Sequence, residues 1–524
     1  KLCSKKAGGR VPEYPRQELP DATKWDHTKW SPNYRNDNRI ETHESGTAPC
    51  KTACPAHVAV QGYLKLAAQG RYDEALALIK RENPLPAICG RVCNRRCEDA
   101  CTRGRVDEAV AIDEVKKFIA QRDLDAATRY IPPVVTPTRA GGFDQKIAII
   151  GAGPAGLSCA FYLAEKGYKP VVFEKNERPG GMLTYGIPSF KLQKDVIEAE
   201  VKIIRLMGAE FRYGVEVGRD VTLDELRAQG FKAFYVAIGC QGGRLAGIPG
   251  EDAEDVTVAV DFLREVNSGK IDALPGRTIV VGGGNVAIDV ARNACRLGSE
   301  HVEMFCLESE AQMPASEEER REAVEDGAHI SCGWGPKEVH LDEAGRVCGI
   351  TFKRCTRVFD DEGRFAPEYD ENDLRRVDAD RVVMSIGQSI VWGDLLAGSK
   401  VELGRGQGAL ADPQTYQTAE PDIFVGGDVY TGPSFAIDAI AAGHEAAVSI
   451  HRFVQPGSTL TIGRNQRRYT ALDRDDVVIE GYDNASREVA HVDREREKTA
   501  PFSEYVETFT EEQVRAETAR CLGC

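Results

Sequence analysis

The chain has 524 residues, with 67 Lys and Arg against 82 Asp and Glu, so its formal net charge is −15. This length accommodates about three domains with large cores, and the acidic balance argues against nucleic acid or an anionic membrane surface as partners. No apolar run reaches the length of a membrane span, the N-terminus lacks a signal-peptide pattern, and the uneven placement of the 16 cysteines indicates a reducing cytoplasm.

The N-terminal part contains a polar arm and a cysteine-rich region. Residues 1–48 have no periodicity and are predicted to form an extended arm. Helical patterns over 60–81 and 112–122 predict a small α-helical domain spanning 49–128. The cysteines of this domain are Cys50, Cys54, Cys89, Cys93, Cys97 and Cys101. Their near-regular steps of four, and the proline after the second of them, favour iron–sulfur clusters, with a zinc site as the alternative.

A dinucleotide-binding pattern begins after a Pro- and Gly-rich linker. A buried strand predicted over 147–150 runs into a glycine loop and an apolar helix, where a pyrophosphate approaches the helix N-terminus. Glu174 ends the next predicted strand, where a carboxylate accepts hydrogen bonds from ribose hydroxyls. The Gly-rich turn over 180–188 offers the flat, apolar surroundings that a flavin ring requires. The candidate contacts in this half are Gly151, Gly153, Pro154, Ala155, Gly156, Glu174, Lys175, Gly181, Met182, Gly186, Ile187, Pro188 and Gly239.

A second loop of the same kind follows a strand predicted over 278–281. Its candidate contacts, which precede an amphipathic helix, are Gly282, Gly283, Gly284, Asn285 and Val286. Glu308 follows the next predicted strand, 301–307, where a carboxylate accepts from a free ribose 2′-hydroxyl and repels a 2′-phosphate. This pattern favours NADH over NADPH; the alternative is that Glu308 is an exposed acid beyond the strand end.

The chain then returns to the first dinucleotide fold. Strands are predicted over 382–386 and 422–428, and a helix over 436–451. The candidate contacts in this part are Gly387, Gly427, Asp428 and Ser434. We therefore predict a discontinuous FAD-binding domain, 146–255 and 386–455, into which an NAD(H)-binding domain, 256–385, is inserted.

The C-terminal part, residues 456–524, is charged and low in periodicity, and is predicted to wrap around the rest of the chain. Thr510 and Gln513 form a capping-box pattern that opens a short helix. This helix leads to Cys521 and Cys524, a CxxC pair that indicates either cluster ligands or the start of a ferredoxin module.

The chain contains the motifs APCKTACP, CGRVC with two further cysteines, GAGPAGL, PGGMLTYGIP, GGGNVAID and a GGD segment before a helix. Together they resemble the glutamate synthase small-subunit family. That family includes the large subunit of the electron-bifurcating NADH-dependent ferredoxin:NADP oxidoreductase and the N-terminal half of dihydropyrimidine dehydrogenase.

The resemblance implies an α/β protein with two nested Rossmann-like domains of the glutathione-reductase type, preceded by a small α-helical iron–sulfur domain. It implies FAD at residues 151–156, Glu174 and Asp428, and NAD(P)H at residues 282–289, a range that ends at Asp289. It also implies two [4Fe–4S] clusters in the helical domain.

The chain departs from the family in three places. Relatives carry an arginine pair where this chain has the acidic run around Glu308, which favours NADH. Relatives carry an RCLxC segment before the position of Cys50, whereas here that pattern stands at Cys521 and Cys524. Neither a glutamine-amidotransferase nor a pyrimidine-binding segment is present, so substrate chemistry of that kind is expected on another subunit.

The second departure suggests a ligand set for each cluster. The hypothesis is that Cys521 and Cys524 join Cys50 and Cys101 around one cluster. The other cluster would be held by Cys54, Cys93 and Cys97, with a fourth ligand among Asp113, Glu114, Lys116 and Cys89.

These features predict a cytoplasmic, NADH-favouring flavoprotein subunit that passes electrons from FAD through the clusters to other redox subunits, with ferredoxin as one candidate partner. A module of an electron-bifurcating complex is favoured over an NADPH-dependent glutamate synthase small subunit. A non-enzymatic electron relay with a vestigial NAD site is the remaining alternative. No catalytic residue is assigned, because hydride transfer to a flavin needs no side-chain acid or base. Thioredoxin-reductase-like chemistry is disfavoured, because Cys159, Cys240 and Cys295 stand alone.

Overall fold

The computed structural model describes residues 46–135, 142–464, 469–473 and 484–524. The chain forms two compact units, 1–46 and 47–524, and only Gly46 of the first unit is described. The predicted arm, residues 1–48, therefore lies almost entirely outside the described residues. Within those residues, no helix is both long enough and apolar enough to cross a membrane.

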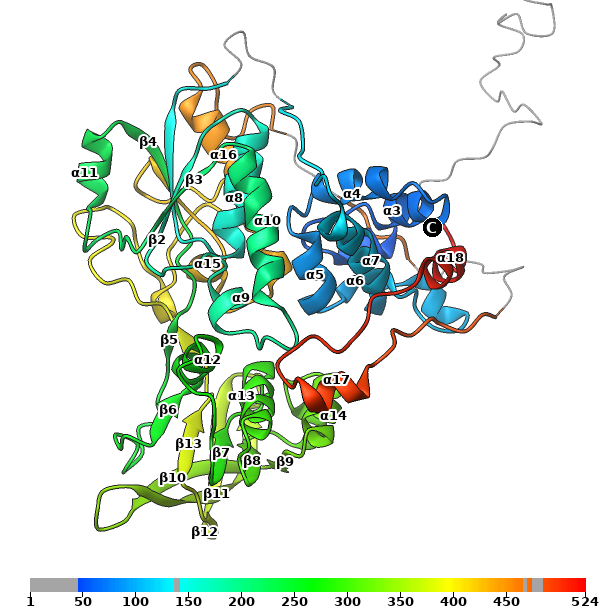
Figure 1. Cartoon of the computed structure of the whole chain (residues 1–524). Helices are drawn as coiled ribbons and strands as arrows, with labels where there is room; N and C mark the ends of the chain where they lie inside the picture. Colours follow the sequence, from blue (N-terminus) through cyan, green and yellow to red (C-terminus); the bar gives the residue numbers. More distant parts are fainter. Residues whose placement is uncertain (1–45, 136–141, 465–468, 474–483) are drawn as a thin grey trace, which may run out of the picture. The chain divides into compact units, whose positions relative to one another are not determined.

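Short helices form the N-terminal part of the second unit (Figure 1). They are α2 (Pro49–Ala53), α3 (Val60–Ala68), α4 (Tyr72–Lys80), α5 (Pro86–Val92), α6 (Arg96–Asp99), the 3-10 turn η3 (Thr102–Arg105) and α7 (Ile112–Asp125). The helical segment predicted over 60–81 is divided in two, because Gly70 adopts a left-handed conformation with φ +71°. The amides of Gly70 and Arg71 donate to the carbonyls of Ala67 and Leu66, a Schellman motif that ends α3.

A five-stranded parallel sheet, in the order β15-β4-β1-β2-β3, forms the first dinucleotide fold. Its strands are β1 (Lys146–Ile150), β2 (Val171–Glu174), β3 (Glu210–Tyr213), β4 (Phe231–Val236) and β15 (Ile423–Val425). Its helices are α8 (Pro154–Glu165), α9 (Met182–Tyr185), α10 (Lys194–Leu206), α11 (Leu223–Ala228), α15 (Asp428–Thr431) and α16 (Ala436–Val454). Helices α8 and α16 pack closely at Gly443. A Cβ there would lie 2.2 Å from the Ala155 carbonyl oxygen, so only glycine permits this approach.

A second five-stranded parallel sheet, β6-β13-β7-β8-β9, lies between the two halves of the first fold in sequence. Its strands are β6 (Val256–Val258), β7 (Arg277–Val281), β8 (His301–Cys306), β9 (His329–Cys332) and β13 (Arg381–Met384). Its helices are α12 (Ala259–Asn267), α13 (Asn285–Arg296), η4 (Glu310–Gln312) and α14 (Glu317–Glu325). The short strands β5 (Gly242–Gly243) and β14 (Gln388–Ser389) pair near the points where the chain enters and leaves this insert.

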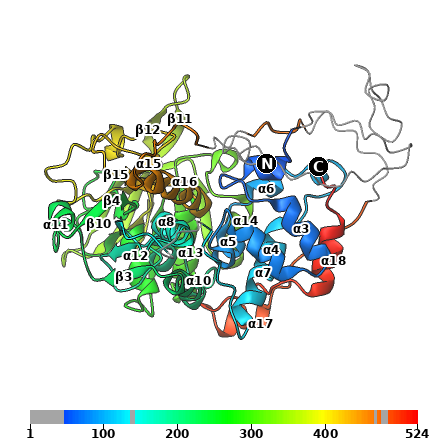
Figure 2. The same cartoon turned by 90° about the horizontal axis from the view of Figure 1, so that it is seen from above.

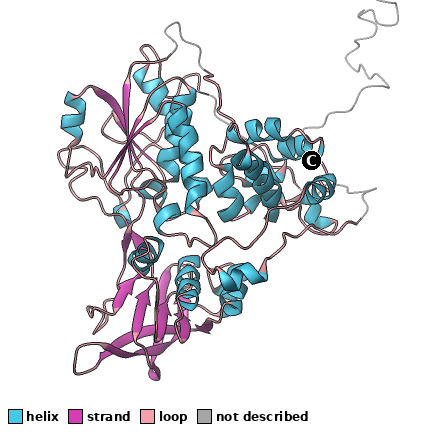
Figure 3. Ribbon diagram, viewed as in Figure 1, coloured by secondary structure: helices cyan, strands magenta, loops and turns pink. Residues whose placement is uncertain are grey.

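The insert also contains a three-stranded antiparallel sheet that the sequence analysis did not predict (Figure 3). It consists of β10 (Trp334–Leu341), β11 (Val347–Phe359) and β12 (Phe365–Val377). The Phe352 ring stacks on Phe305 of β8 with 3.9 Å between centroids, so the antiparallel sheet shares a core with the parallel one.

The C-terminal strap, defined here as residues 484–524, contacts both the inserted fold and the helical region (Figures 1 and 2). Its α17 (Arg494–Thr499) bonds to the inserted fold, since Arg296 donates to Glu497 over 3.1 Å. Its α18 (Glu511–Ala519) packs against α3 and α7. The predicted capping box of α18 is confirmed: Gln513 N donates to Thr510 Oγ1 (3.2 Å) and Thr510 N to Gln513 Oε1 (3.0 Å).

Candidate functional site

One cavity brings together residues of both dinucleotide folds and of the helical region. The first fold contributes Gly151, Gly153, Pro154, Ala155, Glu174, Gly181, Met182, Gly186, Ile187, Gly239, Gly427, Asp428 and Ser434. The inserted fold contributes Val286 and Asp289 from α13, and the helical region contributes Val92, the residue before Cys93. A group bound here would therefore lie between the nucleotide loop of the insert and the cysteine-rich helices.

The first glycine loop is shaped by two different requirements. A Cβ on Gly156 would lie 2.0 Å from the Gly151 carbonyl oxygen, so α8 can start this close to β1 only with glycine. At Gly153, by contrast, an added Cβ would meet no described atom within 4 Å. The open space at Gly153 faces the N-terminus of α8, where free amides bind an anion. This geometry fits the diphosphate of FAD.

Glu174 connects this loop to an adjoining cavity. Its side chain is 3% exposed, and its two oxygens accept from the amides of Ala152 (2.8 Å) and Asn176 (2.9 Å). The adjoining cavity is lined by Glu174 and Lys175 together with apolar side chains that include Trp392 and Leu395. An apolar slot beside a carboxylate fits an adenosine, whose base packs on the apolar side chains and whose ribose bonds to the acid. Sequence reasoning missed Trp392 and Leu395, because they lie in a loop without a recognisable motif.

The other predicted contacts of the first fold lie around the main cavity. Asp428 Oδ1 accepts from the amide and hydroxyl of Ser434 (3.2 and 3.3 Å), and burial raises the pKa of Asp428. Pro188 begins a turn in which its carbonyl accepts from Lys191 N (3.1 Å). Gly387 has φ +113° just after β13, and its neighbour Gln388 lines the cavity.

The second glycine loop joins β7 to α13. A Cβ on Gly282, which has φ +141°, would lie 2.2 Å from the Ser385 carbonyl oxygen. At Gly284, the counterpart of Gly153, an added Cβ would meet no described atom within 4 Å. A Cβ on Gly283 would lie 3.0 Å from Glu308 Oε2, so the carboxylate is beside the loop although Glu308 follows the end of β8 by two residues. A carboxylate in this place would reach the ribose of a dinucleotide bound at the loop.

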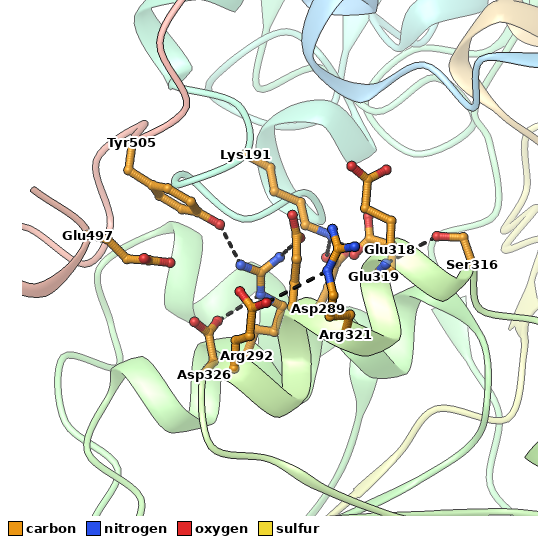
Figure 4. Close-up of polar contacts among 12 residues, drawn as sticks. Lys191, Asp289, Arg292, Ser316, Glu318, Glu319, Arg321, Asp326, Glu497 and Tyr505 are labelled. Atoms are coloured by element: carbon orange, nitrogen blue, oxygen red, sulfur yellow. Dashed lines mark hydrogen bonds and ion pairs between the residues drawn. The ribbon is translucent and has the colours of Figure 1, made fainter. Parts of the chain in front are cut away.

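Ion pairs join the two folds beside the main cavity (Figure 4). Lys191 of the first fold donates to Asp289 Oδ1 (2.6 Å) and also bonds to Glu319 of α14. Burial, the strongest influence, raises the pKa of Asp289 to about 6. Asp289 is thus both a cavity residue and part of the connection between the folds. The family motif predicts Asp289 at the nucleotide, whereas no local pattern marks Lys191 as its partner.

The C-terminal strap extends this network. Arg292 of α13 is 1% exposed; it donates to Tyr505 Oη of the strap (2.6 Å) and to Asp326 Oδ2 (2.7 Å). Glu504, the preceding strap residue, bonds to Arg91 (3.0 Å) and Lys117 (2.8 Å) of the helical region. Adjacent strap residues therefore bind the inserted fold and the helical region.

Four cysteines from distant parts of the sequence line one small cavity: Cys50, Cys101, Cys521 and Cys524. Burial, together with the nearby thiols of Cys101, Cys521 and Cys524, raises the pKa of Cys50 to about 12. A raised pKa means that forming the thiolate costs free energy. Iron binding would offset that cost, because the metal binds thiolates and displaces their protons. Every cysteine among the described residues is free of disulfide bonds.

A second group contains Cys54, Cys89, Cys93 and Cys97, and packs in the same core. Burial raises the pKa of Cys93, and nearby Cys54 adds to the increase. Of the candidates for a fourth ligand, Cys89 Sγ lies 3.8 Å from Asn83 Oδ1, while the buried Asp113 and Lys116 form an ion pair. Burial raises the pKa of Glu114 to about 7.

In the described ranges, no group of three or more His, Cys, Asp and Glu side chains is placed to hold a single metal ion. A four-iron cluster makes a different demand, because each thiolate binds a different iron and the sulfur atoms stand further apart. Both cysteine groups therefore fit iron–sulfur ligation in the chemistry of their donors.

The second cysteine group lies beside the main cavity. Cys97 is in α6, and the neighbouring Arg96 bonds to Asp438 of α16 (2.9 Å) and lies over the Phe435 ring. Phe435 itself lines the cavity, as does Val92 before Cys93.

Two protein-family models match the chain. The model described as pyridine nucleotide-disulphide oxidoreductase matches residues 145–443, and the model described as dihydropyrimidine dehydrogenase domain II, 4Fe-4S cluster, matches residues 41–128. An FAD- and NAD(P)-binding region is thus preceded by a 4Fe–4S region.

Among curated proteins, the chain is 35% identical over 513 residues to the NADP(+)-dependent formate dehydrogenase subunit beta of Moorella thermoacetica, covering 91% of this chain and 70% of that protein. It is 35% identical over 431 residues to the glutamate synthase [NADPH] small chain of Escherichia coli, covering 78% and 89%. It is 32% identical over 517 residues to the NADPH-Fe(3+) oxidoreductase subunit beta of Geobacter sulfurreducens, covering 91% and 75%.

Among solved structures, FprA of Mycobacterium tuberculosis in complex with NADPH matches with a TM-score of 0.51 and 19% identity. The match covers 59% of this chain and 84% of FprA. At this identity the likeness concerns the fold of the two dinucleotide domains.

Proposed function

We infer the function from the premise that the chain belongs to the glutamate synthase small-chain-like family of FAD- and NAD(P)-dependent oxidoreductases with an N-terminal 4Fe–4S region. It is an NAD(P)H-dependent oxidoreductase. We propose that it oxidises NADH and delivers the electrons to other subunits of a multi-subunit redox complex. Relatives named as beta subunits or small chains support the assignment to a complex.

The main cavity is the observation that carries this proposal. It is lined at once by the first glycine loop, by Asp289 of the inserted fold and by Val92 beside Cys93. FAD bound there supplies hydride acceptance from a reduced nicotinamide and release of single electrons to iron–sulfur clusters. The protein contributes the anion-binding end of α8, the ribose acceptor Glu174 and the apolar slot at Trp392.

The preference for NADH rests on Glu308. Its carboxylate lies beside Gly283, where it would accept from a 2′-hydroxyl and repel a 2′-phosphate. A nearby cation, Arg354, lies against Gly333 with its guanidinium over the Trp334 ring at 5.2 Å. It is the candidate partner for a 2′-phosphate if NADPH is the better donor.

We further propose two [4Fe–4S] clusters with the ligands inferred from the sequence. Cys50, Cys101, Cys521 and Cys524 would hold one, and their common cavity supports this set. Cys54, Cys93 and Cys97 would hold the other, nearer the flavin cavity. The double variant Cys521→Ser, Cys524→Ser should retain FAD and lose about half of the iron. An unchanged iron content and two unchanged cluster signals would refute this ligand set.

The decisive experiment is an anaerobic titration of the purified protein with NADH and, separately, with NADPH. Flavin absorbance reports the first electron acceptor, and electron paramagnetic resonance reports the clusters. We expect NADH to bleach the flavin faster and cluster signals to follow. Faster bleaching by NADPH would overturn the NADH preference, and bleaching by neither would favour an electron relay supplied by another protein.

A further inference from the structure

Two cysteines of the inserted fold meet at the nucleotide loop and belong to neither cysteine group of the helical region. Cys306 ends β8 and Cys332 ends β9, and the two residues pair directly in the parallel sheet. Their sulfur atoms lie 3.7 Å apart. Cys306 is 2% exposed, whereas Cys332 is half-buried. Hydride transfer and cluster ligation leave both thiols unused.

The backbone geometry is compatible with a disulfide between them. Adjacent strands lie about 4.8 Å apart, within the range of about 4.4–6.8 Å that disulfides require between Cα atoms. The two sulfur atoms lie 3.7 Å apart. A disulfide requires about 2.0 Å between them, so its formation requires rotation about the side-chain bonds and an adjustment of the backbone where β8 and β9 end.

The dithiol lies against the residues that face the nucleotide. A Cβ on Gly283 would lie 2.9 Å from Cys306 Cβ and 3.0 Å from Glu308 Oε2. Cys306 Sγ lies 3.7 Å from the Glu308 carbonyl oxygen, which also accepts from Gly333 N (2.9 Å) just after Cys332. Cys306 thus lies beside the loop that would bind the pyrophosphate, and its sulfur contacts the backbone of the residue that would bind the ribose.

We propose that Cys306 and Cys332 form a reversible thiol–disulfide site that controls nucleotide binding to the inserted fold, an inference that rests on the proposed NAD(H) site. The oxidant is a low-molecular-weight disulfide. The thiolate of the more accessible Cys332 attacks one of its sulfur atoms, which forms a mixed disulfide and releases one thiolate. Cys306 then attacks the Cys332 sulfur and displaces the second thiolate. The two cysteine protons go to the two released thiolates, and two electrons reduce the oxidant.

The disulfide would weaken NADH binding. Bond formation turns Cys306 Sγ toward Cys332 and away from the Glu308 carbonyl, so the peptide that positions the Glu308 carboxylate shifts. Loss of one charged hydrogen bond to the ribose corresponds to an increase of about tenfold in the KM for NADH. The kcat should change little, because the flavin cavity is not altered.

To test this, the anaerobic holoprotein is treated with glutathione disulfide and its remaining thiols are blocked. Peptide mapping by mass spectrometry then identifies the cysteines that have become cross-linked. The KM for NADH is measured with ferricyanide as acceptor before oxidation, after it, and after re-reduction. We expect a peptide pair cross-linked through Cys306 and Cys332, and a reversible increase in KM. The Cys332→Ser variant should show neither effect, whereas Cys348→Ser, which removes another half-buried cysteine of the insert, should show both.

Absence of the cross-linked peptides would overturn the proposal, and so would a complete cross-link that leaves the KM unchanged. Failure of the reduced protein to oxidise NADH would instead overturn the proposed function. Peptide mapping does not depend on NADH, so the two failures are distinguishable.

Discussion

Gly153 and Gly156 of the first loop differ in what an added side chain would meet. Substituting each of them should therefore affect a different property: FAD binding at Gly153 and folding at Gly156. We expect Gly153→Ala to fold normally but to bind FAD at least tenfold more weakly, because its methyl group occupies the space where the diphosphate would lie. Gly156→Ala places a methyl group against the Gly151 carbonyl and should disturb the packing of α8 on β1.

Thermal unfolding of the FAD-free proteins and FAD titration would check this pair. The expected result is a near-native midpoint for Gly153→Ala and a lowered midpoint for Gly156→Ala. Equal FAD affinity in Gly153→Ala and the parent protein would contradict the assigned diphosphate position.

The Glu308 carboxylate is expected to set the preference between NADH and NADPH. Glu308→Ser removes an acceptor for the 2′-hydroxyl and a negative charge that repels a 2′-phosphate. The ratio of kcat/KM for NADH to that for NADPH should fall by about 10- to 100-fold, as expected for loss of a charged hydrogen bond. Steady-state kinetics with both nucleotides would measure it. Glu310→Gln, an exposed acid two residues further along, is the control and should leave the ratio unchanged.

At the scale of single elements, α18 is the helix that delivers Cys521 and Cys524. Thr510→Ala removes its side-chain cap and should destabilise the helix by about 1 kcal/mol. We expect faster release of iron on exposure to a chelator and faster proteolysis of the C-terminal strap.

Helix α11 provides a matched control, since Thr222 and Glu225 form the same capping box in the first dinucleotide fold. Thr222→Ala makes the same chemical change away from the cysteines. If both variants release iron at the parental rate, the strap does not hold a cluster.

At the scale of the whole second unit, Lys191 joins the first fold to the inserted one. Lys191→Met leaves Asp289 and Glu319 without their cation, and these two carboxylates should then repel each other at the junction. We expect the flavin to be reduced by NADH about tenfold more slowly, because the nicotinamide and the flavin are no longer held in alignment.

Stopped-flow absorbance would measure this rate, and iron content should stay unchanged. Lys202→Met, an exposed lysine on α10, is the control. An unaltered reduction rate in Lys191→Met would mean that the ion pairs do not set the orientation of the two folds.

Electron bifurcation, ferredoxin as a partner and a cytoplasmic location stay predictions from the sequence.

The sequence alone was sufficient for the features that depend on neighbouring residues. Both glycine loops, the strands before them and the helices after them were predicted, because a tight turn, a close approach and an anion site require particular residues at short spacing. The capping box of α18 is local in the same way. The antiparallel sheet was missed because β12 is mostly exposed and rich in charged residues, so it lacks the alternation of apolar residues that marks a half-buried strand.

Only the tertiary structure decided which distant residues meet. The family resemblance suggested that Cys521 and Cys524 join Cys50 and Cys101, but the physical route came from the fold: these cysteines line one cavity because α18 packs against α3. Lys191 meets Asp289, and Cys306 meets Cys332, through the packing of separate elements. The sequence therefore determined the chemistry of each local motif. The packing of helices and sheets, which depends on long-range burial of apolar surface, determined how those motifs combine into a site.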